Sequence, residues 1–241
     1  MDVKEETILG PDIASHWYYV AKGRALRRLL ATCAAREVLD VGAGSGVFSR
    51  QLLDAGICQS AVCVDTAYES DRSELHNGKE IRFRRAVEEV PQKLLLMIDV
   101  LEHVDDDVGL LRHYARSMPI DGRILVSVPA FQFLWSGHDI FLEHRRRYTL
   151  RQLERVARAA GLEPLVGRYF FASVFPAACV LRLLDRRRVR RRKAPPQSAL
   201  KKHGPVLNRA LIGLLDSERE TLFRVNRLAG LSVFCLAGLR A

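Results

Sequence analysis

Val38-Leu39-Asp40-Val41-Gly42-Ala43-Gly44-Ser45-Gly46 is the stretch of this 241-residue chain that decides the fold. The apolar, β-branched run over 37–41 predicts a strand, and three alternating glycines follow it. A chain that turns at once from a strand into a helix needs backbone angles that favour glycine. We therefore expect a helix to begin near Gly46 and to present its free N–H groups to a ligand on the turn.

Strands and helices alternate along the rest of the chain. Strands are predicted over 60–65, 81–84, 93–99, 123–128, 162–172 and 231–239, and helices over 12–31, 47–55, 105–117, 150–160, 174–184 and 206–228. The polar stretch 69–76 is interpreted as a short helix or loop, and 185–205 as a basic linker that contains prolines. The alternation predicts an α/β fold, a doubly wound parallel sheet.

The composition predicts a single domain with a well-buried core, because 48% of the residues are apolar and 27% are charged. The five cysteines form no CxxC pair, which argues against a zinc or redox motif. No run is long enough for a membrane span and no secretory signal is recognised, so a cytoplasmic location is expected. The net charge of +10 is local, since 182–202 holds ten basic residues and one acid.

The spacing of the glycines separates two kinds of cofactor. A dinucleotide fingerprint GxGxxG would need glycine at position 47, where this chain has Val47. Asp65 ends the next predicted strand, where a carboxylate can accept hydrogen bonds from ribose hydroxyls. With Asp40 before the glycines and Asp65 after them, the pattern resembles motif I of class I S-adenosylmethionine-dependent methyltransferases.

The resemblance implies a fold for nearly the whole chain. It is a Rossmann-like sheet of seven strands, with the last strand antiparallel inside the sheet and a helical insertion between the last two strands. One methyltransferase domain would then span 1–241. Its parts would be an N-terminal helical lid over 1–35, a cofactor-binding core over 36–172, a helical and basic insertion over 173–228, and the final strand over 229–241.

The same resemblance implies S-adenosylmethionine as the cofactor. Asp40, Gly42 and Gly44 would lie beside its methionine part, Asp65 would bind the ribose, and the backbone of Ala86 would lie by the adenine. Relatives often carry an aspartate where Arg85 stands, so no side-chain contact to the adenine is carried over. The predicted cofactor-binding set is completed by Ala43, Gly46, Thr66, Asp99, Val100 and Leu101.

The turn Asp99-Val100-Leu101-Glu102-His103-Val104 follows the predicted strand 93–99, at the sheet edge where ligands bind. It resembles the strand-four motif of small-molecule O-methyltransferases, including those acting on quinones, where a carboxylate-x-x-Glu-His set can hold a divalent cation. Asp99, Glu102 and His103 could do the same. The alternative, which we favour, is that Glu102 and His103 cap the next helix and that no metal is bound. The Asn/Asp-Pro-Pro-aromatic turn of base-modifying N-methyltransferases is absent from the sequence.

A polar cluster follows the strand 123–128. It resembles the His-Asp…His-x-Arg-Arg-Tyr signature of a bacterial methyltransferase subgroup, which His16-Trp17-Tyr18-Tyr19 also matches. His138 or His144 could take a proton from a hydroxyl, with Asp139 orienting the histidine. Arg145 and Arg147 could clamp an anionic acceptor. The alternative is that these arginines form salt bridges and that Tyr148 only packs. The predicted acceptor contacts are His103, Arg145, Arg147, Tyr148 and Trp17.

The segment 170–193 places an apolar helix before an arginine run. Such a segment can lie at an anionic membrane surface or bind RNA phosphates, or it can be a solvated charge run. We predict methyl transfer to a small-molecule or lipid-linked acceptor, at a hydroxyl, in the cytoplasm or at the inner face of the membrane. The alternatives are an RNA methyltransferase, with nucleic acid the less favoured partner, and a noncatalytic cofactor-binding protein associated with a membrane.

Overall fold

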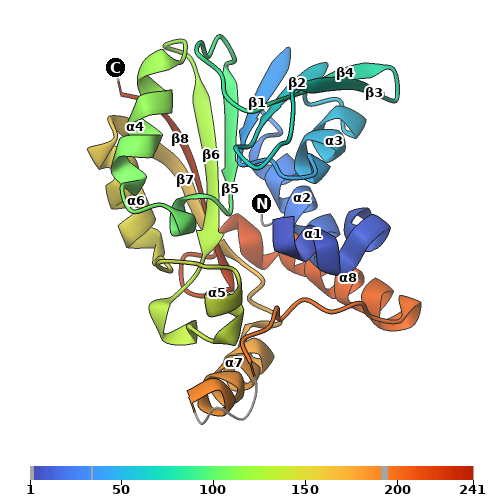
Figure 1. Ribbon diagram of the computed structural model, residues 1–241. Coiled ribbons are helices and arrows are strands. Elements are labelled where there is room, and N and C mark those ends of the chain that lie inside the picture. Colours follow the sequence, from blue (N-terminus) through green and yellow to red (C-terminus); the bar gives the residue numbers. More distant parts are fainter. Residues whose placement is uncertain (1–2, 34, 191–194, 241) are drawn as a thin grey trace.

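The computed structural model describes residues 3–33, 35–190 and 195–240 and contains one mixed sheet in the order β3-β4-β2-β1-β5-β6-β8-β7 (Figure 1). The five strands β4, β2, β1, β5 and β6 run parallel, and β8 is antiparallel to both β6 and β7. The doubly wound fold and the antiparallel last strand are therefore confirmed. The strands are β1 (Glu37–Val41), β2 (Ser60–Val64), β3 (Arg72–His76), β4 (Lys79–Arg84), β5 (Leu94–Ile98), β6 (Arg123–Pro129), β7 (Leu162–Phe170) and β8 (Ser232–Leu239).

The sheet has eight strands where seven were predicted, because β3 forms an edge hairpin with β4. The prediction of a helix or loop over 69–76 was wrong. Asn77 and Gly78 both have positive φ, of 51° and 78°, which is the geometry that an Asn-Gly hairpin turn requires. Apolar periodicity could not reveal β3, since its sequence RSELH is polar and largely exposed at the sheet edge.

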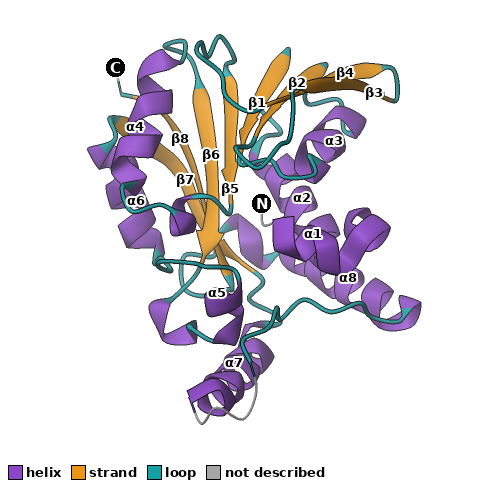
Figure 2. Cartoon of the chain, viewed as in Figure 1, coloured by secondary structure: helices purple, strands orange, loops and turns teal. Residues whose placement is uncertain are grey.

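Helices cover both faces of the sheet and enclose two apolar clusters (Figure 2). One face is covered by α2, α3 and α8, and the other by α4 and α6. The short α5 and the longer α7 lie beyond the carboxyl edge of the parallel strands. The helices are α1 (Val3–Leu9), η1 (Gly10–Ala14), α2 (Trp17–Leu29), α3 (Val47–Asp54), η2 (Leu101–His103), α4 (Asp107–Ser117), η3 (Gln132–Leu134), α5 (Gly137–Phe141), α6 (Leu150–Ala159), α7 (Phe175–Arg190), α8 (Pro205–Glu220) and η4 (Leu222–Arg224).

The predicted helical insertion lies between β7 and β8, as α7 and α8. It differs from the prediction in one respect, because α7 continues through Arg186–Arg188 to Arg190, where a linker was expected. Arginine is a good helix former, and a run of it need not end a helix. Residues 191–193 of the predicted membrane segment 170–193 lie outside the described residues. No helix in the described ranges is both long and apolar enough to cross a bilayer.

The range 12–31, where a single helix was predicted, is divided between η1 and α2. The short η1 ends at Ala14, and α2 begins at Trp17 after His16, whose Nδ1 accepts a hydrogen bond from the backbone N–H of Tyr18. The break falls at His16, whose extended backbone (φ −67°, ψ 133°) ends one helix and begins the next. Whether this region acts as a lid stays a prediction.

Glu218 anchors the insertion to the sheet. This buried side chain of α8 accepts hydrogen bonds from the backbone N–H groups of Ala172 at 2.7 Å and Ser173 at 2.8 Å, just after β7 ends. The two donors are part-buried and have no other partner in the described chain, and they satisfy the buried carboxylate, whose charge would be costly without hydrogen bonds. One carboxylate therefore sets the distance between α8 and the start of α7.

We predict that Glu218→Ala lowers the free energy of unfolding by about 2–3 kcal/mol, because it leaves two N–H groups without an acceptor. Urea denaturation measures this loss. The control is Glu220→Ala in the same helix, an exposed carboxylate that pairs with Arg28 and Arg219 and whose removal should cost less than about 1 kcal/mol. Equal losses for the two variants would contradict an anchoring role for Glu218.

Candidate active site

The glycine turn connects β1 to α3 with a backbone that only glycine adopts freely. Gly42, Gly44 and Gly46 have φ of 68°, 53° and 76°. A Cβ added to Gly42 would lie 2.6 Å from a methyl carbon of Val100, so the β1 and β5 turns touch at this point. Gly46 precedes the first turn of α3, whose N–H groups face away from the strand and can bind a polar group.

Asp65 closes the glycine turn at the end of β2. Its Oδ2 accepts a hydrogen bond from the N–H of Gly44 at 2.9 Å, and its Oδ1 accepts one from Ala67 at 3.0 Å. The hydroxyl of Tyr68 donates to the carbonyl of Gly44 at 2.6 Å. Asp65, the residue predicted to bind the ribose, thus lies beside the glycine turn and is half-buried. Thr66, next to it, is exposed. Ala86, at the end of β4, is exposed at the same sheet edge.

Asp40 is buried beneath the turn rather than open to it. Its Oδ2 accepts a hydrogen bond from the Ser49 hydroxyl of α3 at 2.8 Å, and burial raises the pKa of Asp40 to about 6. Asp40 therefore joins the strand to the helix, and Ala43 beside it is buried as well. The Oγ of Ser45 is buried and has no hydrogen-bond partner in the described chain. This orphaned hydroxyl on the turn is a site residue that the sequence analysis missed.

A buried ion pair links α2 to the turn after β5. Lys22 Nζ lies 2.6 Å and 2.5 Å from the two oxygens of Asp99 and also donates to the Tyr18 hydroxyl at 2.9 Å. The Lys22 side chain is fully buried, whereas 19% of the Asp99 side chain is exposed. Burial by itself lowers the pKa of Lys22, but the Asp99 carboxylate outweighs it and keeps this pKa above its ordinary value. Lys22 was not among the predicted site residues. A lysine four residues after Tyr18, on the same face of a predicted helix, could have indicated it.

Asp139 organises the cluster after β6. Its carboxylate accepts hydrogen bonds from Arg147 Nε at 2.6 Å, from the N–H of Ser136 at 2.9 Å and from His144 Nδ1 at 2.9 Å. Burial opposes ionisation of this group, but the bonds from His144 and Arg147 outweigh burial, and the pKa of Asp139 lies well below its usual range. Because an ionised carboxylate only accepts hydrogen bonds, Nδ1 of His144 is the donor in this contact and Nε2 is on the other side of the ring.

The histidine that Asp139 orients is His144 and not His138. Nδ1 of His138 accepts a hydrogen bond from the N–H of Ala199 at 3.0 Å, and its Nε2 faces Glu5 at 3.9 Å. Burial, helped by the Arg182 charge, lowers the pKa of His138 well below its ordinary value. The prediction of His138 as a base is corrected: it stays neutral and fastens the segment after α7 over the site.

Arg147 and Tyr148 are also corrected, because neither is available to an acceptor. The Arg147 side chain is 1% exposed and bonds to Asp139 and to the carbonyl of Ala130. The Tyr148 hydroxyl donates to Asp107 at 2.8 Å and to the Leu101 carbonyl at 3.1 Å. Both side chains support the site from behind, as the alternative interpretation held.

Arg145 and Trp17 take structural partners as well. Arg145 Nη1 pairs with exposed Asp105 at 2.5 Å and its Nε donates to the carbonyl of His103, so this side chain holds the turn after β5. Its role as a clamp stays a prediction. The Trp17 ring packs edge-on against Phe171 at 6.1 Å. No contact between Trp17 and His144 is observed within the described chain, so the predicted contact of Trp17 with the acceptor stays a prediction.

Glu102, His103 and His144 form the wall of the site between the two turns. Their ligand atoms lie within 4.8 Å of one another, a spacing that could hold a cation. Asp99 is outside this set because Lys22 occupies it. Neither oxygen of buried Glu102 bonds to another residue of the described chain. Burial raises the pKa of Glu102 and lowers that of His103 to about 4, so both groups are neutral when the space is dry.

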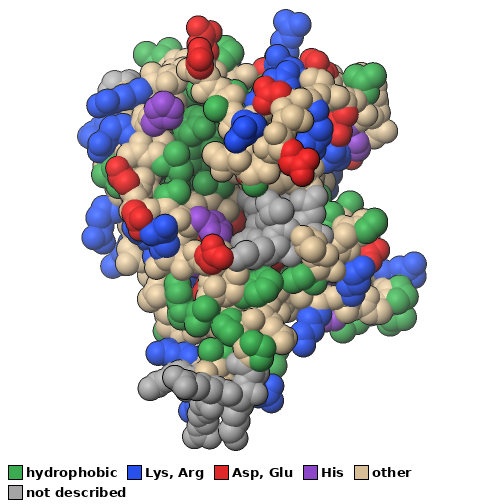
Figure 3. Space-filling view, viewed as in Figure 1, with side chains coloured by type: hydrophobic (Ala, Val, Ile, Leu, Met, Phe, Trp, Pro, Cys, Tyr) green, Lys and Arg blue, Asp and Glu red, His purple; other side chains and the backbone are tan. Residues whose placement is uncertain are grey.

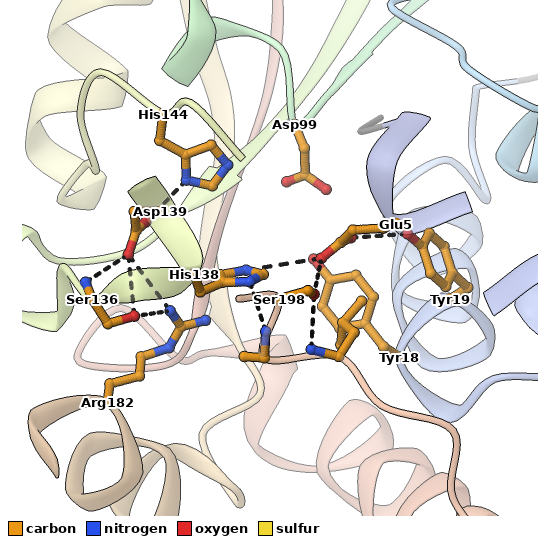
Figure 4. Close-up of polar contacts among 12 residues, drawn as sticks. Glu5, Tyr18, Tyr19, Asp99, Ser136, His138, Asp139, His144, Arg182 and Ser198 are labelled. Carbon is orange, nitrogen blue, oxygen red and sulfur yellow. Dashed lines mark hydrogen bonds and ion pairs between the residues drawn. The ribbon is translucent and has the colours of Figure 1, made fainter. Parts of the chain in front are cut away.

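Figure 4 shows how these groups converge: the imidazole of His144 and the carboxylate of Asp99 are turned toward the same space, with His138 and Tyr18 nearby. The structure places His144 against Asp139 at 2.9 Å and against the ring of His103 at 4.9 Å. The predicted site residues at the ends of β1, β2, β4 and β5 lie along the carboxyl edge of one parallel sheet, where ligands of open α/β sheets bind. A groove that binds a nucleoside and an acceptor side by side needs this arrangement.

A comparison with protein families identifies the class of enzyme. The family model described as a methyltransferase domain matches residues 15–166, which include the glycine turn, Asp99 and the whole Asp139 cluster. The chain belongs to this methyltransferase family. The predicted enzyme class is therefore confirmed, and S-adenosylmethionine is confirmed as the methyl donor at the level of family and fold. A search of curated proteins found no match.

Solved structures show that the methyltransferase fold extends beyond the matched residues. A methyltransferase in complex with the Haloferax volcanii Trm112 methyltransferase activator is 14% identical, over 95% of this chain and 92% of that chain, with a TM-score of 0.55. The CcbJ methyltransferase from Streptomyces caelestis is 13% identical, over 91% and 96%, with a TM-score of 0.52. A phosphoethanolamine N-methyltransferase 2 from Haemonchus contortus, solved with S-adenosylhomocysteine, is 19% identical, over 90% and 53%, with a TM-score of 0.50. At such identities the likeness concerns the fold alone.

The residues of this methyltransferase fit the donor at the glycine turn. The left-handed glycines bring the backbone close, the first turn of α3 offers free N–H groups, and the orphaned Ser45 hydroxyl lies between them. Asp65 lies where the ribose is predicted, and to bind the ribose hydroxyls it would exchange its bond to Gly44 for them.

We predict that Asp65→Ala weakens binding of S-adenosylhomocysteine at least tenfold, because two hydrogen bonds to an ionised acceptor are lost. Isothermal titration calorimetry measures the change. Glu69→Ala removes an exposed carboxylate four residues further on and should leave the affinity unchanged. An affinity that is the same for both variants would contradict the assignment of Asp65.

We predict that the Lys22–Asp99 pair is strongly coupled. Lys22→Met should lower the free energy of unfolding by about 3–5 kcal/mol, and Asp99→Asn should cost more, because it leaves the fully buried ammonium without its carboxylate. Asparagine is chosen because Asp99 has φ of 55°, which asparagine tolerates. The double variant, measured by urea denaturation, should lose much less than the sum of the single losses. Additive losses would contradict a direct pair.

Proposed function

We propose that this methyltransferase transfers a methyl group from S-adenosylmethionine to a hydroxyl of a small-molecule or lipid-linked acceptor. The observation that carries the proposal is the His144–Asp139 pair, 2.9 Å apart and set opposite Asp99 at the carboxyl edge of the sheet. Only 5% of the His144 side chain is exposed, so a ligand that reached it would be shielded from water.

Methyl transfer to a hydroxyl requires a protein group that accepts the hydroxyl proton, because the acceptor oxygen itself is the nucleophile. When bound, the donor supplies a methyl group on a positively charged sulfur, already activated for transfer. An acceptor hydroxyl forms its new O–C bond as the C–S bond breaks, and it must lose its proton in the process. Nε2 of His144 would take that proton, and ionised Asp139 would stabilise the resulting imidazolium. Arg147 and Arg182 hold Asp139 in place for this role.

The apolar surface beside the site supports a lipid-linked acceptor. Phe133 and Ile140, next to the cluster that holds His144, are each about half exposed. A peripheral location at the inner face of the membrane is part of the proposal. The RNA methyltransferase and the noncatalytic cofactor-binding protein are the alternatives that the following experiment separates.

We predict that His144→Asn lowers the turnover number about 10²–10⁴-fold, because it removes the general base, while S-adenosylhomocysteine binding is unchanged. The measurement uses S-adenosylmethionine carrying a labelled methyl group and a host lysate that is then fractionated into lipid, aqueous small-molecule and RNA pools. Label in an alkali-stable methyl ether is expected, since methyl esters are hydrolysed. His113→Asn, an exposed histidine on α4, is the matched control.

The outcomes separate the alternatives. Unchanged turnover in His144→Asn would contradict the base, label in RNA would favour the RNA methyltransferase, and cofactor binding without any labelled pool would favour the noncatalytic protein. A chelator should leave turnover unchanged. Activity that is lost with the chelator and restored by Mn²⁺ would instead assign Glu102, His103 and His144 to a cation.

A further inference from the structure

The outer face of α7 exposes apolar side chains that no part of the described chain covers. Val180 and Leu181 are 58% and 66% exposed, and Leu183 and Leu184 are each more than 40% exposed. In Figure 3 hydrophobic side chains gather on the part of the molecule around α5 and α7, and Figure 1 shows that α7 lies furthest from the sheet. A soluble domain rarely leaves such a group of large apolar side chains together without a partner.

The apolar face continues onto the elements that hold the candidate active site. The ring of Phe175 at the start of α7 lies 6.4 Å from Phe133 on η3, and α7 contacts α5, which exposes Ile140. We call this surface the α7 face. Its residues are Phe133, Ile140, Val180, Leu181, Leu183 and Leu184.

Arginines without partners border the α7 face. Arg186, Arg187 and Arg188 are exposed, and none of them forms an ion pair within the described ranges. Asp185, the single acid of α7, points inward, where its Oδ2 accepts a hydrogen bond from the N–H of Gly137 at 2.8 Å. The outer surface of α7 therefore carries uncompensated positive charge beside exposed leucines, a combination that suits an anionic lipid surface.

The inner face of α7 is fastened to the candidate active site, which keeps the apolar face turned outward. Arg182 reaches Asp139 at 3.6 Å and donates to the Ser136 hydroxyl at 3.2 Å. With the bond between Asp185 and Gly137, three polar contacts hold α7 against α5 and the residue before it. The same carboxylate, Asp139, therefore orients His144 on one side and α7 on the other.

We infer that the α7 face docks on the surface of an anionic lipid bilayer. Its leucines would lie at the boundary between the headgroups and the acyl chains, and Arg186–Arg188 would contact the anionic headgroups. Docking would present the head of a lipid-linked acceptor to His144. This part of the inference rests on the proposed function. RNA is less well matched, since exposed leucines and valines gain nothing from phosphates. A second copy of the chain is disfavoured by the like charge that it would bring.

The test is sedimentation of the full-length protein with vesicles of phosphatidylcholine, with or without phosphatidylglycerol. Binding is expected for the anionic vesicles only and should weaken as salt increases. Replacing Arg186, Arg187 and Arg188 by glutamine should weaken it about a hundredfold, from roughly fivefold for each arginine. Leu181→Gln with Leu184→Gln should weaken it about tenfold or more at unchanged charge.

Matched controls change the same residue types elsewhere. Arg116, Arg151 and Arg155 on α4 and α6 are exposed, so their replacement by glutamine removes the same charge from another surface. Leu75→Gln with Ile120→Gln changes two apolar side chains, 74% and 82% exposed, that lie outside the α7 face. Binding of both control variants should remain within twofold of the original protein.

Several results would overturn the inference. The inference fails if the protein binds no vesicles, binds neutral and anionic vesicles equally, or loses binding equally in the control variants. It also fails if the protein binds a homopolymer RNA in place of vesicles. A dimer in analytical ultracentrifugation that is dissociated by Leu181→Gln with Leu184→Gln would assign the α7 face to a second copy of the chain instead. Titration with S-adenosylhomocysteine is run on every variant. A protein that binds vesicles but transfers no methyl group would retain the docking surface and reject the proposed function, so the two failures are distinguishable.

Discussion

The buried ion pair between Lys22 and Asp99 is the interaction on which the candidate active site depends. It joins the first long helix to the turn after the central strand β5, and it does so where the side chain of Lys22 has no access to water. A charge in such a place is stable only while its partner stays. The pair therefore fixes α2 over the sheet edge, and the space that Asp99 shares with His144 acquires a defined wall.

A second carboxylate, Asp139, fixes the opposite side of the candidate active site, as Asp99 fixes the side formed by α2. Hydrogen bonds from Ser136, His144 and Arg147, together with the nearby guanidinium group of Arg182, favour its ionised form and fix its position. The imidazole of His144 is oriented by this carboxylate, and α7 is tied to the same point through Arg182. One buried anion therefore contacts both the proposed base and the helix that carries the proposed docking surface.

The predictable parts of the structure were those that depend on local sequence. The glycine turn and the alternation of strands and helices follow from short runs of residues whose backbone angles or burial have few alternatives, whereas the antiparallel last strand was implied by the family resemblance. The hairpin strand β3 was missed because it is a polar edge strand with no apolar face to reveal it. Among the site residues, the positions at strand ends were predictable because a parallel sheet brings its carboxyl ends to one edge.

The sequence by itself determined the class of the protein, since Gly42, Gly44, Gly46 and Asp65 can be read without knowing any distant contact. Only the tertiary structure decided the roles of the charged residues that follow β6. Arg147, Arg145 and His138 have the chemistry of ligand-binding groups, yet each is engaged by a partner far away in the sequence or across a turn. The physical reason is that a side chain's function depends on whether its hydrogen bonds and charge are already satisfied. That depends on which distant segments the fold brings against it.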